Sequence, residues 1–267
     1  MDLQLVIICV LTFIIHLIGT LAYSVRIAGV RTRRIAISFA LFNVLVLISR
    51  TSNSFQGPFL AKRVEENLLP VGFHNLLADF RWLLVSATVA TVLGGFLIPT
   101  FQRLFSQAVL HFQVHRSIPR LLLHGFFLGG ITQLKDSVSA PASTNLTQLR
   151  LDRGISSKVI LLNIVAVALW TVGVFAALYA GYLKPELRVT ASTLSSIVNG
   201  VATILMFVFI DPHMSVMTDD VMEGRVSEPS FRRAVVWLVG SRFAGTLLAQ
   251  LLLIPAATLI VYVAEKL

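Results

Sequence analysis

Apolar residues are concentrated in six stretches of the chain, separated by shorter polar segments. A helix needs about 20 apolar residues to cross about 30 Å of hydrocarbon, and these stretches have about that length. The pattern predicts an all-α polytopic membrane protein, a single integral membrane domain over residues 1–267 with about six transmembrane helices. The predicted spans cover residues 3–25, 35–50, 82–101, 159–183, 189–210 and 234–263.

The second stretch has a polar or small stripe along one side. At steps of four and three residues, which return to the same face of a helix, it carries Ala36, Ala40, Asn43, Leu47 and Arg50. A helix that only anchors a protein in lipid needs neither an amide nor a guanidinium at this depth. The stripe therefore indicates a packed interior or a water-filled path.

A shift of 156 positions aligns parts of the chain with each other. Asn43 falls on Asn199, and the Leu-Ile-Pro sequence at 97–99 falls on the same sequence at 253–255. The stripe of the second stretch then corresponds to Ser192, Ser196, Asn199 and Thr203. The shift predicts two inverted three-helix repeats, residues 1–101 and 159–267, with a site at the membrane midplane between them. Chance matches between apolar sequences are the alternative.

The segment between the two predicted halves, residues 102–158, is expected to be a cytoplasmic loop. Residues 101–112 place apolar side chains on one face, which predicts an amphipathic helix at the membrane interface. Residues 118–131 are apolar but only 14 in number, which favours a re-entrant or surface segment over a span. A crossing there would invert the second half.

Composition excludes an ordinary soluble domain. The chain is 56% hydrophobic and 13% charged, with a mean hydropathy of +0.82, whereas soluble domains have about 25% charged residues. The net charge of +9 is better explained by loops that face anionic lipid than by nucleic acid, which is not expected as a partner. Of the 22 lysines and arginines, 14 lie in loops on one side of the six-span arrangement and 7 on the other. This bias predicts a multi-pass protein with both termini outside.

Arg242 is the most unusual candidate for a binding residue. It lies eight residues into the last predicted span, about 12 Å deep at about 1.5 Å per residue. It is expected either to bind an anion in a cavity, because a guanidinium offers bidentate hydrogen bonds to phosphate, or to form a structural ion pair. Gln250 continues its face two turns later.

The other candidate substrate-binding residues each have a structural alternative. Arg50 is also consistent with an interfacial anchor, and His16, a candidate proton relay, with a packing histidine. Amide and hydroxyl groups in membrane helices commonly hold helices together, and this alternative applies to the remaining candidates. These are Asn43, Asn199, Ser196 and Thr203.

Motifs of known enzymes are not found in the sequence. It has no G-x-S-x-G, H-E-x-x-H or Walker A pattern and no Cys/His cluster with zinc spacing, so no catalytic residue, metal or cofactor is expected. The Glu65-Glu66 pair is interpreted as the polar side of a short helix after Pro58. Asp211-Pro212-His213 is expected to end the fifth span.

The run VRIAGVRTRRIAISFALFNVLVLISRTSN, residues 25–53, follows a span that contains His16 and resembles the Amj family of bacterial membrane proteins. Members of that family are lipid II flippases, alternates to MurJ in peptidoglycan synthesis and hence in cell-wall biogenesis and cell shape. The resemblance implies a location in the bacterial cytoplasmic membrane, with lipid II and membrane lipids as partners. It supplies no established site residues, and protein partners are not predicted. A transporter of another lipid-linked or small anionic solute, or a membrane scaffold, is the alternative.

Overall fold

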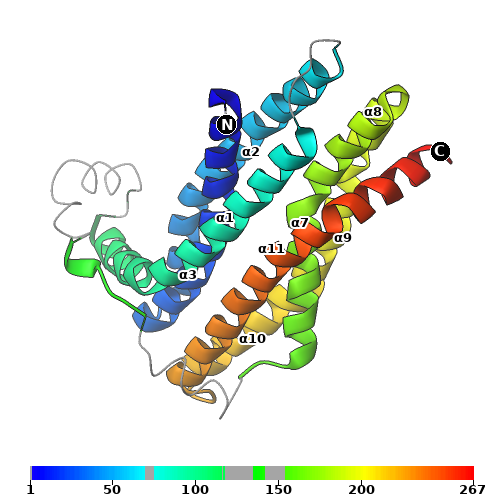
Figure 1. Ribbon diagram of the computed structural model, residues 1–267. Coiled ribbons are helices and arrows are strands. Elements are labelled where there is room, and N and C mark those ends of the chain that lie inside the picture. The colour runs from blue at the N-terminus through cyan, green and yellow to red at the C-terminus, as the bar shows by residue number, and fades with distance from the viewer. Residues whose placement is uncertain (1, 70–74, 116, 118–134, 142–153) are drawn as a thin grey trace.

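The computed structural model is a bundle of long helices (Figure 1), and it describes residues 2–69, 75–115, 117, 135–141 and 154–267. Six helical segments in these ranges are long and apolar enough to span a membrane, which confirms the predicted all-α polytopic class. Five are single helices: α1 (Leu3–Thr32), α2 (Ile35–Asn67), α3 (Leu76–His115), α7 (Ser157–Leu183) and α11 (Glu228–Ala264). The other is a series of pieces: η1 (Pro185–Leu187), α8 (Arg188–Thr193), α9 (Ser195–Ile204), the π-helical turns η2 (Leu205–Ile210) and α10 (Asp211–Met222).

The helices form two groups of similar arrangement, α1–α3 and α7–α11. In the first group α1 packs extensively against both α2 and α3, which touch each other little. In the second, α7 has the same central place between α11 and the α8–α9 segment. The starts of α1 and α7 differ by 154 residues and those of α3 and α11 by 152, close to the 156-residue shift. Figure 1 shows that α1 and α7 run in opposite directions.

The two groups meet mainly along α3 and α11. Near the N-terminal end of α1, one apolar core draws on both groups, and the Phe80 ring of α3 lies 6.1 Å from Phe175 and 5.9 Å from Tyr179 of α7. At the opposite end Arg26 of α1 pairs with Asp211 of α10 at 3.2 Å. The seam is therefore closed by packing at one end and joined by a charge pair at the other.

Close backbone packing holds α7 against α11 in the second group. A Cβ at Gly245 of α11 would lie 2.8 Å from the carbonyl oxygen of Ile164 and from Cβ of Val167. Only a residue without a side chain fits there unless the helices separate. Small residues at helix crossings are the usual means of close approach in membranes, where the hydrophobic effect does not drive helices together.

Three helices continue past points where the sequence predicts an end or a new element. α2 passes through Pro58 without interruption, so Glu65 and Glu66 belong to the same helix and not to a short one. α3 passes through Pro99, so the predicted amphipathic helix at 101–112 is its continuation, with Phe105 and Val109 buried. In Figure 1 this last part of α3 bends aside. A proline can be accommodated in a helix by a bend, because the ring removes one hydrogen bond and displaces a carbonyl.

The fifth span also continues where an end is predicted. The path runs from η2 directly into α10, with Asp211 and Pro212 in the first turn of α10. Proline is tolerated in a first turn because its missing N–H is not needed there, and here that turn follows directly on another helical segment. Residues 118–131, predicted to re-enter or lie on the membrane, fall outside the described residues.

A buried arginine joins the three helices of the first group. Arg63 of α2 is 2% exposed; its Nη1 lies 2.9 Å from Asp2 at the start of α1, and its Nε lies 2.8 Å from Asp79 of α3. Nη1 also donates to the Gln4 side chain at 3.1 Å. The residue thus fixes the three helices at one end of the group.

Replacing Arg63 with leucine is expected to lower the stability of the folded protein. The change leaves the largely buried Asp79 carboxylate without its partner, and breaking a buried pair costs about 3 kcal/mol. Thermal unfolding in detergent measures the effect. Lys62→Leu is the matched control, because Lys62 forms an exposed pair with Glu66 that contributes only about 0.5 kcal/mol. Equal melting temperatures for the two variants would contradict the role of Arg63.

Candidate functional site

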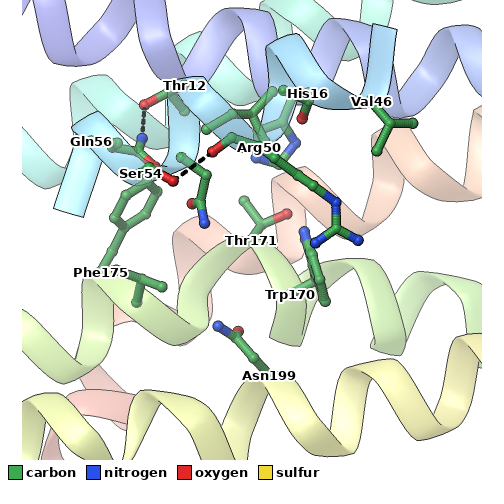
Figure 2. A pocket seen from close by; sticks show the side chains of 14 residues that line it. Thr12, His16, Val46, Arg50, Ser54, Gln56, Trp170, Thr171, Phe175 and Asn199 are labelled. Atoms are coloured by element: carbon green, nitrogen blue, oxygen red, sulfur yellow. Dashed lines mark hydrogen bonds between the residues drawn. The ribbon is translucent and has the colours of Figure 1, made fainter. Parts of the chain in front are cut away.

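A polar cavity of about 380 Å³ lies between the two groups of helices. Its walls come from α1 and α2 on one side and from α7 and α9 on the other (Figure 2). The residues that line it are Thr12, Ile15, His16, Val46, Ser49, Arg50, Asn53, Ser54, Gln56, Trp170, Thr171, Val174, Phe175 and Asn199. A cavity with this many polar groups at the seam between two groups of helices is a candidate substrate site.

The α1 wall carries two polar side chains at helical spacing, Thr12 and His16, both buried, together with Ile15. The Thr12 hydroxyl donates to the carbonyl of Ile8 at 2.8 Å and accepts from the Gln56 amide of α2. Gln56 is itself 5% exposed. This buried hydrogen bond holds α1 and α2 together at the cavity wall and leaves the His16 ring facing the open space.

The α2 wall carries the positive charge of the site. Arg50 is exposed, and Figure 2 shows its side chain extending from α2 toward the α7 wall, where Trp170 lies. Among the described residues that line the cavity, Arg50 is the only lysine or arginine and none is aspartate or glutamate. A guanidinium without a competing carboxylate in the same cavity suits an anionic group such as phosphate.

The α7 and α9 wall depends on a glycine. A Cβ at Gly173 of α7 would overlap Oδ1 of Asn199, so glycine lets the Asn199 side chain lie directly against α7. In Figure 2 the Asn199 side chain points from α9 toward the cavity. Sequence periodicity places Asn199 on a polar stripe, but only the glycine on another helix determines where its amide lies.

Three polar atoms in the cavity lining lack hydrogen-bond partners within the described chain. They are Nδ1 of His16, Oγ1 of Thr171 and Oδ1 of Asn199. Leaving a buried polar atom unsatisfied costs about 1–3 kcal/mol, so such atoms are normally satisfied by protein, water or ligand. Their gathering around one cavity indicates that the space is occupied by water or by a polar ligand in the membrane.

Arg242 lies against α1, outside the cavity lining. It is 7% exposed and its guanidinium lies over Gly19, where a Cβ would overlap Nη2. Gly19 is one turn of α1 from His16. The Nε of Arg242 has no hydrogen-bond partner, and no described carboxylate pairs with it. The structural ion pair considered for Arg242 is therefore not formed within the described residues.

The structure brings together some of the predicted site residues and not others. His16, Arg50 and Asn199 line one cavity, with Arg242 beside it. Asn43 is exposed and lies one turn of α2 before the cavity-lining Val46, outside the lining itself. These three α2 positions, 43, 46 and 50, share one face at helical steps. All five residues of the predicted α2 stripe are exposed, and only Arg50 among them lines the cavity, whose α2 wall begins at Val46.

Three further candidates lie outside the lining. Ser196 is exposed. The Thr203 hydroxyl donates to the backbone carbonyl of Asn199 at 2.7 Å, which satisfies it within its own helix. Gln250 donates to the carbonyl of Arg81 at 3.4 Å, a contact between α11 and α3. These residues hold helices or face outward in this conformation.

Sequence reasoning missed several cavity residues, chiefly Gln56, Trp170 and Thr171. Gln56 was missed because the second span was expected to end at residue 50, while α2 continues to Asn67. Continuing the α2 stripe in helical steps beyond Arg50 would have reached Asn53 and Ser54. No periodic signal marks Trp170 and Thr171, because α7 is apolar over most of its surface.

A second cavity, of about 470 Å³, lies between α3 and α11. Its lining is mostly apolar and includes Val92, Phe96 and Val239. Arg232, its one arginine among the described residues, is paired with Glu228 one turn away. The polar cavity is therefore the better candidate for binding a charged, hydrated group.

Comparison with known proteins agrees with the resemblance seen in the sequence. The family described as Amj, Alternate to MurJ, matches residues 11–264. The Lipid II flippase Amj of Bacillus subtilis (strain 168) is 38% identical over 264 residues, which cover 94% of this chain and 93% of that protein. No solved structure is significantly similar. Because both matches extend over nearly the whole length, the chain belongs to the Amj family of multi-pass membrane proteins.

Proposed function

We propose that this protein is a lipid II flippase, which moves the lipid-linked peptidoglycan precursor from the inner to the outer leaflet of the bacterial cytoplasmic membrane. The observation that carries the proposal is the polar cavity between the two groups of helices, with Arg50 as its charge. It is supported by the relative named Lipid II flippase Amj at 38% identity.

The chemistry of lipid II explains why such a cavity is needed. Its headgroup is a sugar and peptide joined through a diphosphate to a polyprenyl tail. Burying a charge in hydrocarbon costs many kcal/mol, whereas the tail has no such barrier. A flippase therefore has to shelter the headgroup in a polar, cationic path while the tail stays in lipid, and the cavity offers hydroxyl, amide and guanidinium groups for that role.

Alternating access between the two groups is the proposed mechanism. The α1–α2 wall and the α7–α9 wall belong to different groups, so a movement of one group against the other changes both the shape of the cavity and its access. Opposite-running groups around a central site are the arrangement of many transporters that rock between two open states. The loop charges predict that both termini lie outside. The end of the first group that carries Arg31, Arg33 and Arg34 then faces the cytoplasm.

The membrane potential is the proposed energy source. With the cell interior negative, outward movement of each uncompensated negative charge gains about 2.3 kcal/mol per 100 mV. The diphosphate carries such negative charges. Arg50 compensates them only while the headgroup is bound, because the arginine remains with the protein when the lipid is released. Proton transfer through His16 is a less favoured variant, because coupling to the potential needs no titrating group.

Complementation tests the function. Production of this protein is expected to sustain growth of bacteria depleted of MurJ, and lipid II exposed at the outer leaflet is expected to return to a level near that of undepleted cells. Cells that carry an empty vector are the control. Failure of both growth and lipid II exposure, with the protein present in the membrane at normal level, would remove lipid II as the substrate.

Replacing Arg242 tests whether its charge acts in transport. Arg242→Leu removes a positive charge beside His16 and is expected to lower lipid II flipping at least tenfold at normal protein level, while Arg242→Lys retains a charge and part of the activity. Arg103→Leu, at an exposed position of α3, is the matched control and is expected to leave flipping unchanged. Full activity of Arg242→Leu would show that the residue has no role in the path.

A further inference from the structure

The inner part of the polar cavity presents neutral hydrogen-bonding groups that no described residue satisfies. His16 and Thr171 are only 5% and 3% exposed, yet Nδ1 of the first and Oγ1 of the second have no partner. Oδ1 of Asn199 is buried and equally unpartnered. The three atoms come from α1, α7 and α9, three of the four helices that line the cavity.

Thr171 differs from other buried threonines of this protein. The hydroxyls of Thr12, Thr20 and Thr91 each donate to the carbonyl four residues earlier, at 2.8 to 2.9 Å. This internal bond is the usual way in which a threonine is satisfied inside a helix. Thr171 makes no such bond within the described chain, so its hydroxyl is free to donate to a ligand and to accept from it.

The same cavity also contains a charge and an aromatic surface. Arg50 is exposed, and among the described residues that line the cavity it is the only one with a full charge. Trp170, next to Thr171 in sequence, is 43% exposed and contributes an indole ring. The cavity thus combines a cation with a flat aromatic surface and neutral donors and acceptors. A sugar attached to a diphosphate has the matching groups: a C–H face that packs on an aromatic ring, hydroxyl and amide groups, and an anion.

We propose that this cavity is a glycosyl diphosphate site in which Trp170, Thr171 and Asn199 bind the sugar ring next to the diphosphate and Arg50 binds the diphosphate itself. The assignment rests on the proposed lipid II function and says which wall holds which part of the headgroup. Thr171 and Asn199 supply hydrogen bonds to sugar hydroxyl or amide groups, and Trp170 supplies the surface for the ring. Recognition of the sugar then comes from the second group of helices and neutralisation of charge from the first.

Gly173 is a positioning residue for this site. It makes no polar contribution of its own, but a methyl group there would displace the Asn199 amide from its place against α7. Gly200, next to Asn199 on α9, has no atom within 4 Å of an added Cβ. Gly173→Ala and Gly200→Ala are therefore the same chemical change at two positions. Only Gly173→Ala is expected to disturb the proposed sugar contact.

Binding of two lipids to the purified full-length protein in nanodiscs tests the assignment. The probes are lipid II and undecaprenyl diphosphate, which shares the tail and diphosphate but lacks the sugar and the peptide. The wild-type protein is expected to bind lipid II about tenfold or more tightly than the sugar-free lipid, because several hydrogen bonds and a ring contact are added. Thr171→Val, Asn199→Leu and Trp170→Leu are each expected to reduce this preference about three- to tenfold, without changing the affinity for undecaprenyl diphosphate.

Matched variants separate the two halves of the site. Arg50→Gln is expected to weaken binding of both lipids by a similar factor, since both carry the diphosphate. Gly173→Ala is expected to reduce the preference for lipid II as Asn199→Leu does, while Gly200→Ala leaves both affinities unchanged. Size-exclusion profiles and melting temperatures check that each variant is folded, and variants that fail this check are replaced by Thr171→Ala and Asn199→Ala, which remove the same hydroxyl and amide groups without adding volume.

The outcomes distinguish this inference from the proposed function. If the protein sustains growth of MurJ-depleted cells and prefers lipid II, but the Trp170, Thr171 and Asn199 variants keep that preference, the sugar site is overturned and the flippase function stands. If the wild-type protein binds both lipids equally well, the sugar site is overturned as well. If it binds neither lipid and does not sustain growth, both the sugar site and the proposed function fall.

Discussion

The arrangement of this protein depends on how polar groups at membrane depth find partners where water is scarce. Many are satisfied inside the protein: Arg63 by two carboxylates, Gln56 by Thr12, and Asn163 by Ser241 and the carbonyl of Leu238. A smaller set is not, and three of its members line one cavity. The same rule explains both sets, because a group without a protein partner is retained at this depth only where water or a ligand replaces that partner.

Glycines decide where the helices come close enough to build that cavity. Gly245 allows contact between α7 and α11, Gly173 allows Asn199 to lie against α7, and Gly19 makes room for the Arg242 guanidinium. In each case a single added carbon would meet an atom of another helix at less than its contact distance. Packing of small residues therefore fixes the polar groups in the membrane, in a setting where hydrophobic association between helices contributes little.

The paired arrangement of the helices gives the cavity its composition. Each wall belongs to a different group, and the groups run in opposite directions (Figure 1). The walls nevertheless differ, because among the described lining residues the one arginine is on α2 and the one tryptophan is on α7. The two groups of helices thus contribute different side chains to one cavity.

The sequence by itself determined the class of the protein, because the length of an apolar helix is fixed by the thickness of the bilayer and can be read from consecutive residues. It also placed Asn43, Leu47 and Arg50 on one face of α2, since helical periodicity is a local property. It did not show that α2, α3 and the fifth span pass through or beside a proline, because neighbouring helices stabilise the interrupted turns. Only the tertiary structure decided which polar residues meet. Asn199 lines the cavity because Gly173, on a different helix, leaves room for its side chain. Asn43 does not line the cavity, because its side chain is exposed on the outer surface of α2.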